Sequence, residues 1–157
     1  MTDMAMCNEE LEQKIREVVE DLGKAGLIRI LDDKNFIVTK EVVSGTLKTM
    51  LTLALYGAST LPENFAKITE MTPEEIATVS MGLFFTDAII QERIKLGFSQ
   101  EEAMTFKMDY FSTILLISSA IIDIIKKRDP KTYNKLITVA KKLQELAKNP
   151  QKRLRQH

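Results

Sequence analysis

Few residues of this 157-residue chain could carry out catalysis. It has one histidine, His157, at the last position, and one cysteine, Cys7. A Ser–His or Cys–His nucleophile needs an imidazole held in place beside it, which we do not expect of the last residue. Zinc sites use several Cys or His ligands. The six glycines are isolated and form neither a Walker loop nor a GxGxxG turn. We therefore expect no cofactor and no nucleophilic enzyme.

Carboxylates on apolar helices are the remaining candidates for chemistry. Asp87 falls on the predicted inner stripe of one helix, with Glu92 five residues later, and Asp109 and Asp123 flank an uncharged run. Four converging carboxylates could hold Mg²⁺, which prefers oxygen ligands. Helical nucleotide pyrophosphatases work in this way, but their motif, two glutamates with another acid three residues later, is absent here. A magnesium-dependent hydrolase of a phosphate compound remains an alternative to four acids that only pair with cations or face water.

The strongest charge feature is a basic C-terminal region. The net charge is zero, yet residues 126–157 carry 11 of the 22 Lys and Arg and only two of the 22 Asp and Glu. Clustered cations are typical of surfaces that bind phosphate backbones or acidic partners. Tyr133 is the only aromatic residue among them, so base stacking is not expected. The candidates for binding nucleic acid or an acidic partner are Lys127, Arg128, Lys131, Lys135, Lys142, Lys152, Arg153 and Arg155.

A purely structural role could also account for the basic C-terminal region. Its lysines could form a solvated helix face, or cations favoured near a helix C-terminus. They could also complement the acidic body of the protein, either within one molecule or head to tail between two copies.

Residues 12–41 contain a helix, a Gly-Leu-Ile exit, a β-rich pair of runs and a threonine before the next helix. This order resembles the recognition helix and wing of a winged-helix DNA-binding domain. The resemblance implies duplex binding through Arg29 or Lys34. It departs from the pattern in two ways: only seven residues precede the helix, and the helix is acidic, which disfavours a phosphate groove. The alternative is a hairpin that covers one end of a helical bundle.

The element that organises the chain is its most apolar stretch. No charge occurs from Phe111 to Ile122. This run belongs to a helix that we expect over about 100–127, begun by Ser99 with Glu102 completing a capping box. A helix that is apolar on every side must be covered on every side. We therefore predict an all-α bundle of five or six helices around this central helix.

The surrounding elements follow from apolar periodicity and capping residues. Further helices are expected at about 8–24, 40–56, 73–96 and 131–148, with a helical turn near 62–69. Two β-rich runs around a polar turn predict one short hairpin at about 27–39. For the helix at 73–96, the predicted inner stripe is Ile76, Val79 or Ser80, Leu83, Asp87, Ile90 and Ile94.

These features predict a single helical domain over 1–148 and a mobile basic tail over 149–157. The 12-residue uncharged run is shorter than the ~20 residues that a bilayer requires, and we see no signal peptide. We therefore expect a cytoplasmic protein that does not enter a membrane. The leading hypothesis is a non-enzymatic small subunit or adaptor that forms homo-oligomers or joins a larger assembly, with its basic region contacting nucleic acid or an acidic partner.

Overall fold

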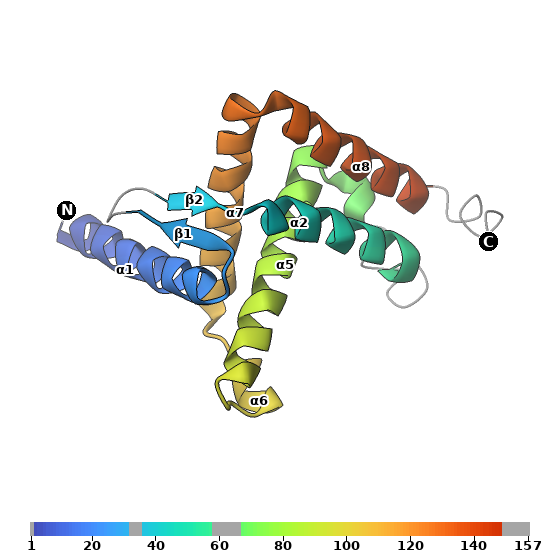
Figure 1. Cartoon of the computed structure of the whole chain (residues 1–157). Helices are drawn as coiled ribbons and strands as arrows, with labels where there is room; N and C mark the ends of the chain where they lie inside the picture. Colours follow the sequence, from blue (N-terminus) through green and yellow to red (C-terminus); the bar gives the residue numbers. More distant parts are fainter. Residues whose placement is uncertain (1, 32–35, 58–66, 149–157) are drawn as a thin grey trace.

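The protein is a bundle of helices with one two-stranded hairpin, as predicted (Figure 1). The computed structural model describes residues 2–31, 36–57 and 67–148. The predicted tail 149–157, with Lys152, Arg153 and Arg155, lies outside these residues. The elements are α1 (Thr2–Lys24), β1 (Ile28–Ile30), β2 (Phe36–Val38), α2 (Lys40–Thr52), a π-helical turn η1 (Leu53–Gly57), a 3₁₀ turn η2 (Lys67–Glu70), α5 (Pro73–Lys95), α6 (Gln100–Ala103), α7 (Met108–Arg128) and α8 (Pro130–Lys148).

An antiparallel pair of helices, α5 and α7, forms the centre of the bundle. The other helices pack around this pair, with α2 and α8 against α5 and α1 against α7 (Figure 1). Phe85 of α5 and Ile114 and Ile122 of α7 are fully buried between these layers. Gly82 allows the pair to approach closely, because a Cβ at this position would stand 2.8 Å from Cδ2 of Leu115.

Capping boxes begin both α5, at Thr72, and α6, at Ser99, where the sequence predicts one. The backbone N–H of Glu75 donates to the Thr72 hydroxyl at 3.1 Å, and the backbone N–H of Thr72 donates to the Glu75 carboxylate at 3.2 Å. Ser99 and Glu102 make the same reciprocal pair at the start of α6. These caps satisfy backbone donors that a helix start leaves free, so the local sequence determines where α5 and α6 begin.

The predicted continuous helix over 100–127 is wrong, because the chain breaks between α6 and α7. The cause lies on α5. The Arg93 side chain donates from Nη1 to the carbonyl oxygens of Ala103 (3.4 Å) and Thr105 (3.2 Å). Its guanidinium also lies 4.4 Å from the centre of the Phe106 ring. These contacts give the carbonyls at the end of α6 a partner outside the helix, so the chain turns there before α7 begins.

The prediction that the central helix is covered on all sides is also wrong. One side of α7 is buried, but Leu116 is 47% exposed and Phe111 and Ile124 are exposed as well. The exposed and half-exposed positions Ser112, Leu115, Leu116, Ser119 and Asp123 recur at helical spacing, so they form one continuous open stripe along α7.

The predicted inner stripe of α5 is confirmed at Ile76 and Ser80, which are buried. It is wrong in the second half of the helix, where Leu83, Asp87 and Ile94 are exposed. The buried residues of α5 are Ile76, Ala77, Ser80, Met81, Gly82, Phe85 and Ile89. The helix has apolar residues on two sides. The packed side is the one that α2 and α7 approach, where Phe84 lies against Gly45 and Leu115 lies against Gly82.

The hairpin and α1 pack beside α7, on one side of the central pair (Figure 1). The strands pair antiparallel, with Ile28 opposite Val38. Leu27 and Ile28 are buried together with Val18 and Leu22 of α1. Thr39 precedes α2, but its hydroxyl makes no cap and donates to the carbonyl oxygen of Leu27 at 3.1 Å instead. In the part of the chain that the structure describes, none of the helices is long and apolar enough to cross a membrane.

Candidate functional site

The main charged surface of the described residues is a row of lysines along α8. Lys131, Lys135 and Lys142 are all exposed and lie four and seven residues apart, which places them on one side of the helix. The opposite side of α8 is buried through Leu136, Ala140, Leu143 and Ala147. Like charges four residues apart destabilise a helix by a few tenths of a kcal/mol, so the row is not explained by the stability of α8.

One lysine of this row, Lys135, lines a groove between α8, α2 and the end of α7. The groove encloses about 560 Å³ and includes Lys135 of α8 and Lys40 of α2. Its floor is apolar, with Val43, Leu47 and Ile125 half-buried between the helices. We call the four cations Lys40, Lys131, Lys135 and Lys142 the basic surface. Sequence reasoning missed Lys40, because no local pattern links the first residue of α2 to a helix some 90 positions later.

The cations of the basic surface form no close ion pair with another described residue, although the charges of Lys40 and Lys131 contribute to lowering the pKa values of Glu41 and Asp129. Among the described residues, none of the four lies within 4.0 Å of an acidic oxygen, and the ion pairs are made by Lys14 with Asp109 and by Lys126 with Glu74 at 3.8 Å. The one acid that lines the groove is Asp129. Its carboxylate accepts from the hydroxyl (2.6 Å) and the backbone N–H (3.2 Å) of Thr132. These hydrogen bonds hold the pKa of Asp129 below its usual value.

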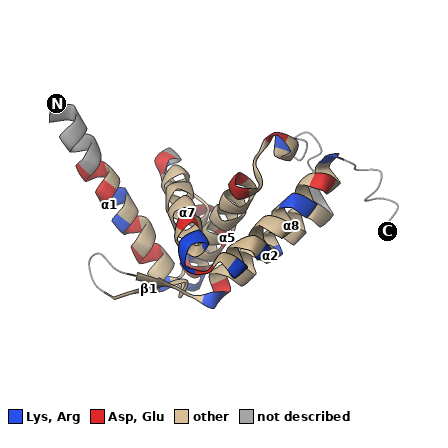
Figure 2. Cartoon of the chain, turned by 90° about the horizontal axis from the view of Figure 1, so that it is seen from above, with Lys and Arg blue, Asp and Glu red and all other residues tan. Residues whose placement is uncertain are grey.

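The distribution of charge over the molecule is uneven. Acidic residues are concentrated along α1 and basic residues along α8 (Figure 2). The exposed Glu9, Glu10, Glu12, Glu17 and Glu20 lie on several sides of α1. The acidic body therefore does not neutralise the basic surface.

Two other predicted basic residues belong to a different helix. Lys127 and Arg128 are exposed in the last turn of α7, which ends at Arg128, so the helical spacing of the row does not extend to them. The structure brings Lys131, Lys135 and Lys142 together and leaves Lys127 and Arg128 at the corner between α7 and α8.

The four predicted carboxylates do not gather into a metal site. Asp109 pairs with Lys14, Asp87 and Asp123 are exposed, and Glu92 is half-buried. In the described ranges, no group of three or more His, Cys, Asp or Glu side chains lies close enough to hold a metal ion. Arg93, the cation that follows Asp87 on α5, does not pair with it, because the Arg93 guanidinium contacts Phe106 and the end of α6.

The hairpin, which resembles a wing, places Arg29 on the surface, whereas Lys34 lies outside the described residues. The helix before it carries mostly acidic side chains (Figure 2). Leu27 and Ile28 are part of the core. The hairpin is therefore anchored to the core through Leu27 and Ile28, with Arg29 on its exposed side.

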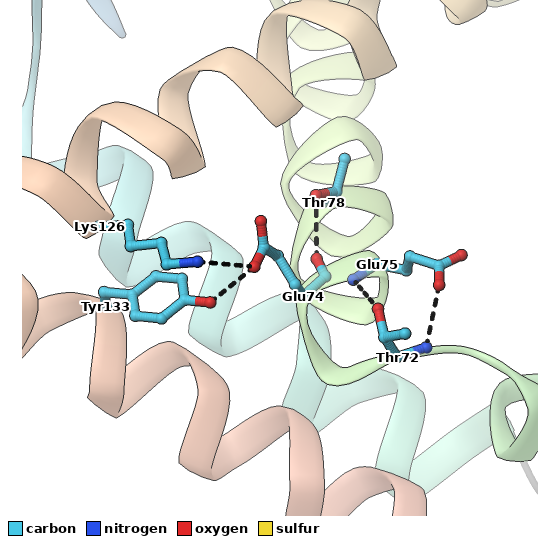
Figure 3. A network of polar contacts seen from close by, with 6 residues as sticks. All are labelled: Thr72, Glu74, Glu75, Thr78, Lys126 and Tyr133. Carbon is cyan, nitrogen blue, oxygen red and sulfur yellow. Dashed lines mark hydrogen bonds and ion pairs between the residues drawn. The ribbon is translucent and has the colours of Figure 1, made fainter.

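A second groove lies where α5, α7 and α8 meet, and encloses about 630 Å³. Its floor contains Val79, Leu115 and Ile137. At its edge, the Tyr133 hydroxyl donates to Oε2 of Glu74 at 2.7 Å, and Lys126 lies near the same oxygen (Figure 3). The hydrogen bond to Glu74 raises the pKa of Tyr133 to about 12. Nζ of Lys126 also lies 5.4 Å from the centre of the Tyr133 ring, so both the hydroxyl and one face of the ring have a partner within the protein.

Comparison of the chain with protein-family models, with curated proteins and with solved structures finds no match.

Proposed function

We propose that this protein is a helical interaction protein that binds the phosphate backbone of nucleic acid through its basic surface. The observation that supports this most is a set of four exposed lysines, three in a row on α8 and one on α2, none of which lies within 4.0 Å of a carboxylate oxygen among the described residues. The row spans about 16 Å at the rise of an α-helix. Duplex DNA presents one charge per about 1.7 Å of its axis, so about ten phosphates lie within that length.

The composition of the basic surface favours contact with phosphates over reading of base sequence. Lysine acts as a mobile point charge, whereas arginine is the residue suited to bidentate contacts with guanine. The only aromatic residue of α8, Tyr133, is bonded to Glu74. We therefore propose binding that is independent of the base sequence and strongly dependent on salt. The protein would then be a cytoplasmic adaptor or small subunit rather than an enzyme.

The test is the binding of labelled duplex and single-stranded DNA of mixed sequence, measured by fluorescence anisotropy at low salt. The test variant replaces Lys40, Lys131, Lys135 and Lys142 by Gln. The control variant replaces Lys24, Lys67, Lys95 and Lys107 by Gln, which changes the net charge equally at exposed positions on other elements. We expect the test variant to lose binding by at least 100-fold, since four phosphate contacts are removed, and the control to bind within a few-fold of the original chain.

Two results would contradict the proposal. Equal losses in the two variants would mean that net charge, and not this surface, attracts the DNA. Binding of polyglutamate with the same affinity as DNA would point instead to an acidic protein partner, the other class of ligand that the lysines could serve.

A further inference from the structure

The open face of the α5–α7 pair is a second exposed surface, distinct from the basic surface. On α7 it consists of Phe111, Ser112, Leu115, Leu116 and Ser119, and on α5 of Val79, Leu83, Thr86 and Ile90. Each of these side chains is half-exposed or exposed. The two stripes are adjacent, because Val79, Leu115 and Ser119 line the same groove and Leu115 lies against Gly82. The side chains named here are uncharged, whereas Asp87 and Asp123 are exposed on the same sides of α5 and α7, one turn after Leu83 and Ser119. Exposed apolar side chains that gather in this way mark an interaction site.

We propose that this face binds a second copy of the chain, so that two α5–α7 pairs form an antiparallel four-helix bundle. The size of the face is suitable. Helices of 23 and 21 residues give a surface roughly 30 Å long and 20 Å wide, or about 600 Å². A stable interface buries about 800 Å² on each partner, and the remainder would come from the helices on either side.

Those neighbouring helices carry opposite charges, which is why a second copy fits. Seen along the bundle, α1 and α8 extend as two diverging arms on either side of α7 and α5 (Figure 2). The arm formed by α1 has exposed glutamates on several sides. On α8, Lys141 and Lys148 follow Ile137 and Gln144 by one turn each, and Ile137 lines the groove beside the open face. These two lysines are distinct from the basic surface.

The charges select one of the two ways in which the faces could pair. A two-fold axis perpendicular to α5 and α7 would place α1 beside α1 of the other copy, which brings acidic arms together. An axis parallel to α5 and α7 places α1 beside α8 of the other copy and α7 opposite α5 of the other copy. Both arrangements keep the facing helices antiparallel, but only the second matches opposite charges.

This arrangement also predicts which residues meet. Gly82 and Leu115 are in contact within one copy, so they lie at the same height along the pair. A two-fold axis parallel to the helices preserves height. Leu116 of one copy therefore faces Leu83 of the other.

The first measurement is the mass of the full chain at micromolar concentration by light scattering after gel filtration. We expect a dimer. Leu116→Glu places a charge in the centre of the open face and should give a monomer. Leu51→Glu is the matched control, because Leu51 is 56% exposed on α2, away from this face, and it should remain a dimer. Circular dichroism is used to check that each variant is folded. We expect Leu116→Glu to fold, because the Leu116 side chain is already 47% exposed to solvent.

The second measurement tests the arrangement and does not depend on a destabilising variant. Chains with Cys7→Ser and either Leu83→Cys or Leu116→Cys are mixed and oxidised. We expect the mixed disulfide between the two chains in excess over the like-with-like products. A monomeric original chain, a dimer that survives Leu116→Glu, or oxidation that gives only like-with-like disulfides would overturn the proposal.

Discussion

The contact between Gly45 of α2 and Phe84 of α5 gives the sharpest prediction on how the basic surface is positioned. A Cβ at Gly45 would overlap three atoms of the Phe84 ring. The ring would have to retreat by roughly 1.5 Å to regain ordinary carbon–carbon separation. Gly45→Ala therefore forces α2 away from α5, and α2 carries Lys40.

The expected free-energy change has two opposing parts. Overpacking of this kind costs about 1–3 kcal/mol, whereas replacement of Gly by Ala inside a helix gains about 1 kcal/mol. In the original chain, Gly45→Ala should lower the free energy of unfolding by about 1 kcal/mol. In a Phe84→Ala background the ring is absent and the same change should raise it by about 1 kcal/mol. The coupling of about 2 kcal/mol corresponds to about 4–8 °C in Tm for a chain of this size.

The assay is urea unfolding of the four chains, followed by circular dichroism at one protein concentration, so that association affects all of them alike. Gly82→Ala is a useful comparison, because its neighbour is the flexible end of Leu115 at 2.8 Å, and it should be tolerated better. The reasoning is refuted if Gly45→Ala changes stability by the same amount with and without the Phe84 ring, within the ~0.5 kcal/mol expected of independent sites.

Three further predictions concern the remaining features. Ile122→Ala, at a fully buried position of α7, should lower the free energy of unfolding by about 2–5 kcal/mol. Leu116→Ala, on the open face of the same helix, should lower it by less than ~1 kcal/mol in dilute, monomeric protein. Equal losses of the two variants in urea unfolding would contradict the burial of one side of α7. Arg93→Lys should speed amide hydrogen exchange at 104–107, because lysine cannot make both carbonyl hydrogen bonds and the ring contact; unchanged exchange would mean that Arg93 does not set this break. The raised pKa of Tyr133 favours its protonated form in the folded state, so its contribution to stability is present below pH 10 and is lost as pH rises toward about 12. Tyr133→Phe should therefore lose less stability over that range. A phenolate absorbance titration of this variant should lack the step near pH 12 and keep the later one of Tyr110, whose pKa is raised by burial and by its hydrogen bond to Asp21.

Features that depend on near neighbours in the chain could be predicted from the sequence. The capping boxes at Thr72 and Ser99 need only residues three positions apart, and both are present. The hairpin follows from β-branched residues on either side of a polar turn. The row on α8 follows from helical spacing alone, once the helix is placed.

Features that depend on distant contacts could not be predicted in this way. The chain after α6 contains no glycine or proline between 104 and 107, and the break depends on Arg93, ten residues earlier. The buried side of α5 was predicted wrongly because Leu83, Ile90 and Ile94 form as good an apolar stripe as Met81, Phe85 and Ile89. The close approaches at Gly45 and Gly82 determine which of the two stripes is buried. The sequence around each glycine does not indicate which side chain it will contact.

The most direct test of the central proposal is the slope of log K against log salt for duplex DNA. If all four lysines of the basic surface contact phosphates, the slope should be about −3.6, at about −0.9 per contact. Lys135→Gln should reduce its magnitude by about 0.9, and Lys95→Gln should leave it unchanged. A slope near zero, or one that Lys135→Gln does not alter, would contradict the assignment of this surface to nucleic acid.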